Sequence, residues 1–248
     1  MSEAAVVPET KPLSQVERVV DAYIAPTKTF SDIRRNASWW LPFVLVSIVG
    51  LAFAYVVMHK VGLSTLVDSI IHNSASLSDH VSNATPADAA KIRDSIGAQL
   101  RYIYAAPVIV MLAGLIVAGL FLATANFGFG GRATYGQMLA VWFYGSLPLM
   151  IMSLLTIVTL YAGMQSDNFN INNTVGTNIG YFLQGGDTPH WLVTMLSSVD
   201  VFAIWSAILL TIGVSIVAGI KRSSAAIVVF GWWILYVLLQ TAKAALLG

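Results

Sequence analysis

The residues best placed to do chemistry in this sequence are Asp200 and Lys243, which lie at the ends of long apolar stretches. An enzyme or ion-coupled transporter that works inside a membrane needs ionisable side chains there. Asp200 precedes an apolar stretch, so its carboxylate is expected to cap a helix, where the dipole and backbone amides stabilise negative charge. The alternatives are an ion pair with Arg101 or contact with a ligand. None of these supplies a second catalytic group, so we assign no catalytic residue.

Histidines and glycines give no convincing metal or phosphate site. His72 and His80 have aspartates nearby, but the polar segment 73–78 between them is expected to interrupt a helix that would align them. The glycines before Arg132 resemble part of a phosphate-binding loop, yet no strand precedes them and no P-loop lysine follows. The chain has no cysteine, which excludes disulfides, thiolate metal sites and a cysteine nucleophile. We therefore expect no enzyme, no metal and no other cofactor.

The composition indicates a membrane protein. Of the 248 residues, 57% are hydrophobic and 10% are charged, whereas soluble domains average about 45–50% and about 25%. So little polar surface could not cover a core in water. The net charge of +1 also excludes the clustered basic surface that nucleic-acid binding requires.

Five apolar windows without Lys, Arg, Asp or Glu are each long enough to cross a bilayer, which takes about 20 helical residues. Their runs are continuous, whereas the strands of a membrane barrel would alternate apolar and polar residues. The sequence therefore predicts an all-α membrane protein, with a five-helix domain over residues 36–248. The expected spans are about 39–59, 102–126, 135–163, 200–220 and 224–246.

Basic residues in the connections predict the orientation, because lysine and arginine favour the cytoplasmic side. The loop 165–199 has neither, whereas the loop 61–101 has several. With five spans, the N-terminus is expected in the cytoplasm and the C-terminus outside. The basic residues then on the cytoplasmic side are Lys28, Arg34, Arg35, Arg132, Lys221 and Arg222.

The N-terminal region is expected to be a disordered tail over residues 1–12 and an amphipathic segment over 13–35 on the cytoplasmic surface. In the first helix of that segment, an apolar face is expected, made by Val16, Val19, Val20, Tyr23 and Ile24, and Glu17, Arg18 and Asp21 are expected to face away from it. This helix is expected to lie along the cytoplasmic surface. In the second, Phe30 and Ile33 should turn toward lipid, and Arg34 and Arg35 toward anionic headgroups. These four side chains are candidates for contact with the membrane or with a cytosolic partner.

The two outer loops have different patterns. Loop 61–101 repeats apolar residues at helical spacing, and Thr85 followed by Pro86 and Asp88 indicates a helix start. A helical hairpin is expected there. Loop 165–199 is rich in asparagine and glycine, so turns or short extended segments are expected.

Uncharged polar residues within the spans are the remaining candidates for a site. Pro148 is expected to kink the third span, because proline removes a backbone hydrogen bond. Polar groups near the kink and on neighbouring spans could line a small intramembrane cavity, or they could form ordinary interhelical hydrogen bonds worth about 0.6 kcal/mol each. The candidate set is Asn126, Tyr144, Ser146, Pro148, Thr156 and Gln240.

The order of several motifs resembles the Yip family, the Ypt/Rab-interacting five-span membrane proteins, in its bacterial form. The residues that carry the resemblance are Pro26, Phe30 and Ile33, the run Ser38–Phe43, the run Ala133–Gln137 with Leu147 and Pro148, and Asp200–Phe202 with Trp205 and Gly213. The resemblance implies a cytosolic N-terminal region and five helices and, in eukaryotic members, a role in vesicle traffic through small GTPases. The Asp-Leu-Tyr-Gly-Pro motif of those members is missing before the first span here, which weakens the expectation of GTPase binding.

Two functions from different classes follow. The first is a non-enzymatic scaffold or adaptor in a bacterial inner membrane, which organises partners or bilayer shape. The second is a permeation or transport protein for a small molecule or lipid, with a passage beside the kinked third span. The partners expected are the lipid bilayer, a membrane or cytosolic protein, and further copies of the chain. Nucleic acid is not among them.

Overall fold

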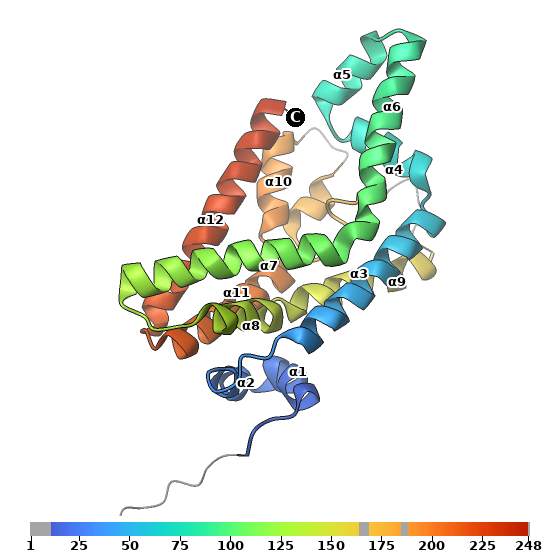
Figure 1. Cartoon of the computed structure of the whole chain (residues 1–248). Coiled ribbons are helices and arrows are strands. Elements are labelled where there is room, and N and C mark those ends of the chain that lie inside the picture. Colours follow the sequence, from blue (N-terminus) through green and yellow to red (C-terminus); the bar gives the residue numbers. More distant parts are fainter. Residues whose placement is uncertain (1–10, 164–168, 185–187, 248) are drawn as a thin grey trace, which may run out of the picture.

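A computed structural model describes residues 11–163, 169–184 and 188–247, and every regular element in these ranges is a helix. The expected tail 1–12 lies almost wholly outside the described residues. Five helical runs are long and apolar enough to cross a membrane (Figure 1). They are Trp40–Lys60, Pro86–Gly128, Tyr135–Tyr161, Val201–Ala218 and Arg222–Leu246. The predicted fold class, an all-α membrane protein, is confirmed.

The first two runs differ in shape. Helix α3 (Trp40–Lys60) is a single helix. The second run joins α6 (Pro86–Leu100), the 3₁₀ turn η1 (Arg101–Ala105), α7 (Ala106–Ala123) and the π-helical turn η2 (Thr124–Gly128). The chain changes direction between α6 and α7 (Figure 1), where Pro107 in the first turn of α7 has no amide hydrogen to donate.

The third run is broken at the predicted place. Helix α8 (Tyr135–Gly145) begins with a capping box from Thr134, and α9 (Leu147–Tyr161) follows after Ser146 alone. Pro148 lies in the first turn of α9, where proline is tolerated because that amide has no helical partner.

The last two runs are α11 (Val201–Ala218) and α12 (Arg222–Leu247). Helix α11 ends at Gly219, whose φ of 68° is a left-handed conformation that glycine adopts without strain. Half of the apolar window of α11 is buried, against 17% of that of α12, so α11 is a central helix and α12 a peripheral one.

Further helices lie outside these runs. Helices α4 (Leu63–His72) and α5 (Ala75–Asn83) precede α6, whose N-cap is Thr85, as the sequence predicts. The asparagine-rich loop is not built of turns alone, because it contains the 3₁₀ turn η4 (Ile179–Leu183) and the helix α10 (His190–Ser198). The prediction for this loop was wrong there, since its apolar residues pack as a helix beside α12 (Figure 1).

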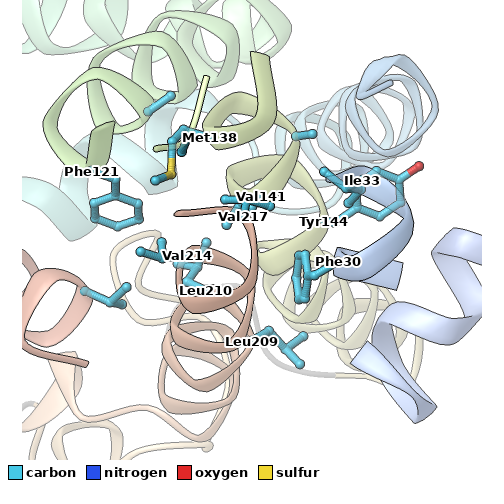
Figure 2. Close-up of a cluster of buried hydrophobic side chains, with 14 of the residues drawn as sticks. Phe30, Ile33, Phe121, Met138, Val141, Tyr144, Leu209, Leu210, Val214 and Val217 are labelled. Atoms are coloured by element: carbon cyan, nitrogen blue, oxygen red, sulfur yellow. The ribbon is translucent and has the colours of Figure 1, made fainter. Parts of the chain in front are cut away.

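The main core forms where α8 faces α11. Val141 of α8 and Val214 of α11 are buried there, together with Phe30 from the N-terminal region (Figure 2). Two glycines allow this close approach. A Cβ atom at Gly145 would lie 2.5 Å from Leu210 Cδ2, and one at Gly213 would lie 2.7 Å from Val141 Cγ1.

We expect Gly145→Ala to lower the free energy of unfolding by about 1–3 kcal/mol, because the added methyl group overpacks this contact. Gly231→Ala in α12 is the matched control, since a Cβ there meets nothing within 4 Å. Thermal unfolding of both variants in one detergent measures the difference. Equal midpoints for the two variants would contradict close packing of α8 against α11.

Candidate functional site

The candidate site is the pair of short helices before the first run, which we call the N-terminal hairpin: α1 (Gln15–Ile24) and α2 (Pro26–Ile33). Helix α1 starts with a capping box, in which the Ser14 hydroxyl accepts from the Glu17 amide and the Glu17 carboxylate accepts from the Ser14 amide. These hydrogen bonds lower the pKa of the exposed Glu17 carboxyl. Pro26 then begins α2, where its fixed φ suits the first helical position.

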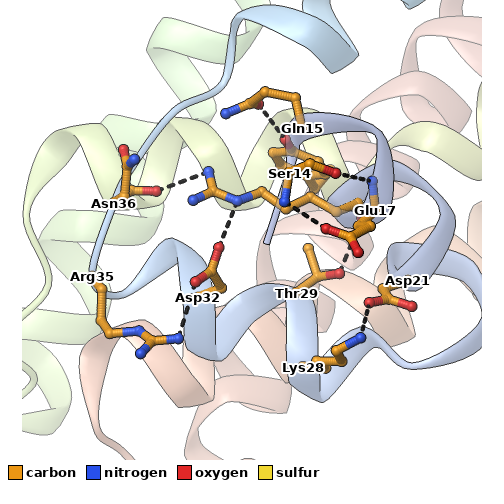
Figure 3. A network of polar contacts seen from close by, with 11 residues as sticks. Ser14, Gln15, Glu17, Asp21, Lys28, Thr29, Asp32, Arg35 and Asn36 are labelled. Atoms are coloured by element: carbon orange, nitrogen blue, oxygen red, sulfur yellow. Dashed lines mark hydrogen bonds and ion pairs between the residues drawn. The ribbon is translucent and has the colours of Figure 1, made fainter. Parts of the chain in front are cut away.

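A buried ion pair holds the two helices together. Arg18 Nε donates to Asp32 Oδ2 at 2.7 Å, and their side chains are only 1% and 3% exposed (Figure 3). Arg18 Nη1 also donates to the carbonyl of Asn36 at 3.1 Å, and Arg35 Nη2 donates to Asp32 Oδ1 at 3.0 Å. The Asp32 carboxylate therefore binds two guanidinium groups and links α1, α2 and the segment that leads to α3.

A second ion pair lies at the rim of the hairpin. Lys28 Nζ is 2.7 Å from Asp21 Oδ2, and the Lys28 side chain is 58% exposed. Hydrogen bonding to Asp21 raises the pKa of the Lys28 ammonium. The Thr29 hydroxyl donates to the carbonyl of Arg18 at 3.0 Å, so it satisfies a buried backbone group beside the central ion pair.

Helix α1 is amphipathic, as the sequence predicts, but Arg18 and Asp21 on its charged side do not face away from the protein. Arg18, Asp21 and Ala22 are its buried residues, whereas Val16, Val20 and Ile24 are exposed. Here the inward side carries charges that find partners in α2.

The expected lipid contact of Phe30 and Ile33 is also wrong. Both side chains are fully buried in the core, and Phe30 occupies the space that Gly213 leaves on α11 (Figure 2). Arg34 is exposed, as expected, while its backbone carbonyl accepts from Gln137 Nε2 at 2.8 Å. Arg35 has half of its side chain exposed and pairs with Asp32.

Tyrosine contacts fasten α1 to the membrane runs. The Tyr23 hydroxyl donates to the carbonyl of Leu147 at 3.0 Å, and its ring packs edge-on against Trp205 at 5.7 Å. The Tyr144 hydroxyl of α8 donates to Gln15 Oε1 at 3.1 Å. The hairpin is thus part of the folded domain and not a tether.

Burial raises the pKa of Tyr23 to about 12, whereas the unfolded chain titrates near 10. Above pH 10 the unfolded state loses this proton first, so stability falls as the pH rises from about 10 to about 12. We expect Tyr23→Phe to show a weaker decline than the parent protein over this interval. Unfolding midpoints measured across the interval test this, and identical profiles would contradict a buried Tyr23 hydroxyl.

The six residues expected around an intramembrane cavity do not gather at one place. Asn126 closes the turn after α7 through the amide and carbonyl of Ala133, and the Thr156 hydroxyl pairs with Thr174 at 2.7 Å and with the carbonyl of Met152. Gln240 Nε2 donates to Tyr236 within α12. Each of these three polar side chains has hydrogen-bond partners in its own surroundings, so we interpret the three interactions as structural.

The three remaining residues of that set lie at the break between α8 and α9. Tyr144 bonds to Gln15, and Pro148 is buried in the first turn of α9. The buried Ser146 hydroxyl has no hydrogen-bond partner among the described residues. Two grooves of about 580 and 450 Å³ lie elsewhere, on the surface of helices α4, α5 and α6.

Asp200 acts as a helix cap, which is the first of the three interpretations of the sequence. Its Oδ1 accepts from the Phe202 amide at 2.8 Å, and its Oδ2 accepts from the Thr177 hydroxyl and the Asn178 amide. The alternative ion pair with Arg101 does not form between these two described residues. The carboxylate is already satisfied inside the protein, and Arg101 is exposed.

Among the residues that the structure describes, no three His, Asp or Glu side chains come together as a metal site. The arrangement is therefore that of a helical membrane domain with a charged hairpin built into it. Sequence comparison agrees with this architecture, because the chain matches the Yip1 domain family over residues 20–243. The chain belongs to the Yip1 family. No curated protein and no solved structure matches it.

The Yip1 match begins at Val20 in the middle of α1, so the family domain includes most of the hairpin. This agrees with the fold, in which the hairpin contributes to the same core as α8 and α11. Sequence reasoning missed the buried Arg18–Asp32 pair. The available signal was the spacing of the two residues from the turn at Pro26. Arg18 lies eight residues before Pro26 and Asp32 lies six residues after it, which is about two helical turns in each case. This spacing brings the two side chains together when the second helix folds back along the first.

Proposed function

We propose that this Yip1-family protein is a non-enzymatic membrane scaffold or adaptor. The observation that supports the proposal is the presence of folded helical elements at opposite ends of the molecule: the N-terminal hairpin at one, and helices α4–α6 with α10 at the other (Figure 1). Among the described residues, neither end brings together three His, Asp or Glu side chains that could hold a metal ion. Folded helical surfaces of this kind are suited to binding protein partners.

In the proposed orientation the hairpin is cytoplasmic and the C-terminus is outside, in a bacterial inner membrane. Five crossings place the two ends of the chain on opposite sides. The hairpin, the turn at Arg132 and the turn at Lys221 and Arg222 supply the basic residues expected on the cytoplasmic side.

The cytoplasmic partner surface that we propose is the outer side of α2. Its exposed residues are polar or basic, namely Thr27, Lys28, Ser31 and Arg34. Such a surface suits a cytosolic protein with acidic side chains. On the other face, the groove of about 580 Å³ between α4, α5 and α6 offers a second surface, with apolar residues that include Ile70, Leu77 and Ile96.

The permeation alternative is less well supported. It requires polar groups that line one continuous passage, but Asn126 lies in the turn after α7 and Gln240 lies near the far end of α12. Eighteen residues separate Gln240 from the start of α12, which is about 27 Å along the helix. Asn126 lies at the opposite end of the helix bundle from Gln240, so the two side chains cannot line the same cavity.

A photo-crosslinking amino acid at Ser31 tests the adaptor role in native membranes. We expect a protein adduct from Ser31 that disappears when Lys28 and Arg34 are replaced by glutamate, because charge reversal repels an acidic partner. Ile234, half exposed on α12, is the matched control and is expected to react with lipid. The proposal fails if Ser31 yields no protein adduct, or if the adduct is indifferent to the charge reversal.

A further inference from the structure

The two helices of the hairpin expose chemically different surfaces. On α1, Val16, Val20 and Ile24 are 66%, 50% and 75% exposed. They are four residues apart, so they form one continuous line along the helix, which we call the α1 ridge. The exposed residues of α2 are polar or basic. The surface of α2 is therefore compatible with water, whereas burial of the α1 ridge against an apolar surface would be favourable.

Contacts of the hairpin show where the α1 ridge lies along the third run. The carbonyl of Arg34 bonds to Gln137, near the start of that run, and Tyr23 bonds to the carbonyl of Leu147. Ten residues of helix separate these two points, which is about 15 Å. The hairpin therefore lies beside the apolar wall of the membrane domain and does not project away from it.

The length of the third run explains how this position remains at the membrane surface. The run has 27 residues, more than the roughly 20 that a perpendicular helix needs, and a long apolar helix tilts to fit the bilayer. If the run is tilted so that the hairpin is on its cytoplasmic side, the hairpin reaches the plane of the headgroups. Its ridge then meets the boundary between headgroups and acyl chains.

Basic side chains surround the same end of the molecule. Arg132, Lys221 and Arg222 are exposed, and none of them forms an ion pair with another described residue. The turn at Arg132 is joined to the end of α11, since the Arg132 amide donates to the carbonyl of Ala218 at 3.0 Å. These cations therefore lie at one level, where anionic headgroups complement their charge.

We propose that α1 is an interfacial helix that binds an anionic lipid monolayer. The α1 ridge enters the acyl boundary, and the surrounding cations contact lipid phosphates. The inference deepens the proposed function, on which it rests for the cytoplasmic side: lipid fixes α1, and α2 stays free to meet a protein. It sharpens the expectation that this amphipathic helix lies along the cytoplasmic surface, and it assigns the lipid contact to Val16, Val20 and Ile24 and not to Phe30 and Ile33.

The absence of cysteine makes a direct test practical, because a single introduced cysteine takes the only thiol label. Val20→Cys and the control Ser31→Cys are each spin-labelled in the full-length protein. They are reconstituted in phosphatidylcholine vesicles with or without phosphatidylglycerol. Collision with oxygen, which prefers lipid, is compared with collision with a water-soluble nickel complex. Unchanged unfolding midpoints confirm that both variants are folded.

We expect the oxygen-to-nickel ratio to be several-fold higher at Val20→Cys than at Ser31→Cys. The difference should grow when phosphatidylglycerol is added, and this growth should be lost in an Arg132→Gln, Arg222→Gln background. Equal ratios at the two sites would overturn the proposal and leave the α1 ridge as a surface for a cytosolic protein. A high ratio that ignores phosphatidylglycerol would overturn the assignment to anionic lipid. The purified protein has no partner, so these results are independent of the crosslinking result.

Discussion

Replacing Asp32 with alanine is expected to lower the free energy of unfolding by about 3–5 kcal/mol, because it strips a buried cation of its counter-ion. The Arg18 side chain is 1% exposed, and the Asp32 carboxylate is the anion that it pairs with, while the carbonyl of Asn36 also accepts a hydrogen bond from it. Arginine does not deprotonate in proteins, so the guanidinium cannot avoid the cost by becoming neutral. The same change also removes one ion pair of Arg35. Chemical unfolding in detergent measures the loss.

Asp68→Ala is the matched control for Asp32→Ala. Asp68 also pairs with an arginine, Arg93, but both side chains are about half exposed, and such pairs contribute only about 0–1 kcal/mol. The double variant Arg18→Met, Asp32→Leu should recover most of the loss, since an apolar pair of similar size needs no counter-ion. Equal effects of Asp32→Ala and Asp68→Ala would contradict the burial of the ion pair.

Replacing Phe30 with alanine is expected to cost about 3–5 kcal/mol, the range for removing a buried phenylalanine. Its ring is fully buried between α2 and α11 and approaches Gly213, whose missing side chain makes the space. Because Phe30 is the main apolar anchor of α2, we also expect the hairpin to open more often. Limited proteolysis within residues 13–35 should then accelerate, together with a lower unfolding midpoint.

Phe127→Ala is the control, because Phe127 is the same residue type and is 91% exposed. It should leave the unfolding midpoint and the proteolysis rate of the hairpin nearly unchanged. If Phe30→Ala behaved like Phe127→Ala, the hairpin would not be docked in the core. Phe30 would then be free to contact lipid, as the sequence predicts.

The five runs were predictable because a bilayer demands long apolar segments, and charge-free windows reveal them directly. The break at Pro148 and the helix start at Thr85 were also predictable, since proline and cap residues act locally. Loop 165–199 was predicted less well. Its asparagines suggested turns, but the apolar residues of α10 find a packing surface on α12 that the local sequence does not reveal.

The hairpin could not be oriented from the sequence. Periodicity shows that α1 has an apolar and a charged side, but the inward side depends on what surrounds the helix. In water the valines would turn inward. In this protein Arg18 turns inward because it pairs with Asp32, fourteen residues later in the chain. Val16 and Val20 are therefore exposed on the outer side of the helix. Phe30 and Ile33 were misplaced for the same reason, because the space at Gly213 exists only after α8 and α11 pack together.

The candidate polar residues show the limit of reasoning from residue type. Asp200 was predictable as a cap, because a carboxylate before an apolar run has a local partner in the next helix amides. Its remaining partners, Thr177 and Asn178, come from the preceding loop and have no sequence signal. Asn126 and Gln240 were grouped because both are polar within apolar runs, whereas their depth depends on the direction of each helix.

Labelling of single cysteines in intact cells tests the central claim most directly, namely that folded surfaces face opposite sides of one membrane. Ser31→Cys marks α2, Ser82→Cys marks α5, and Ala245→Cys marks the end of α12; all three positions are exposed. A membrane-impermeant maleimide should label Ser82→Cys and Ala245→Cys from outside, and Ser31→Cys only after the membrane is opened. Labelling of Ser31→Cys and Ala245→Cys from the same face would contradict five crossings and the scaffold built on them.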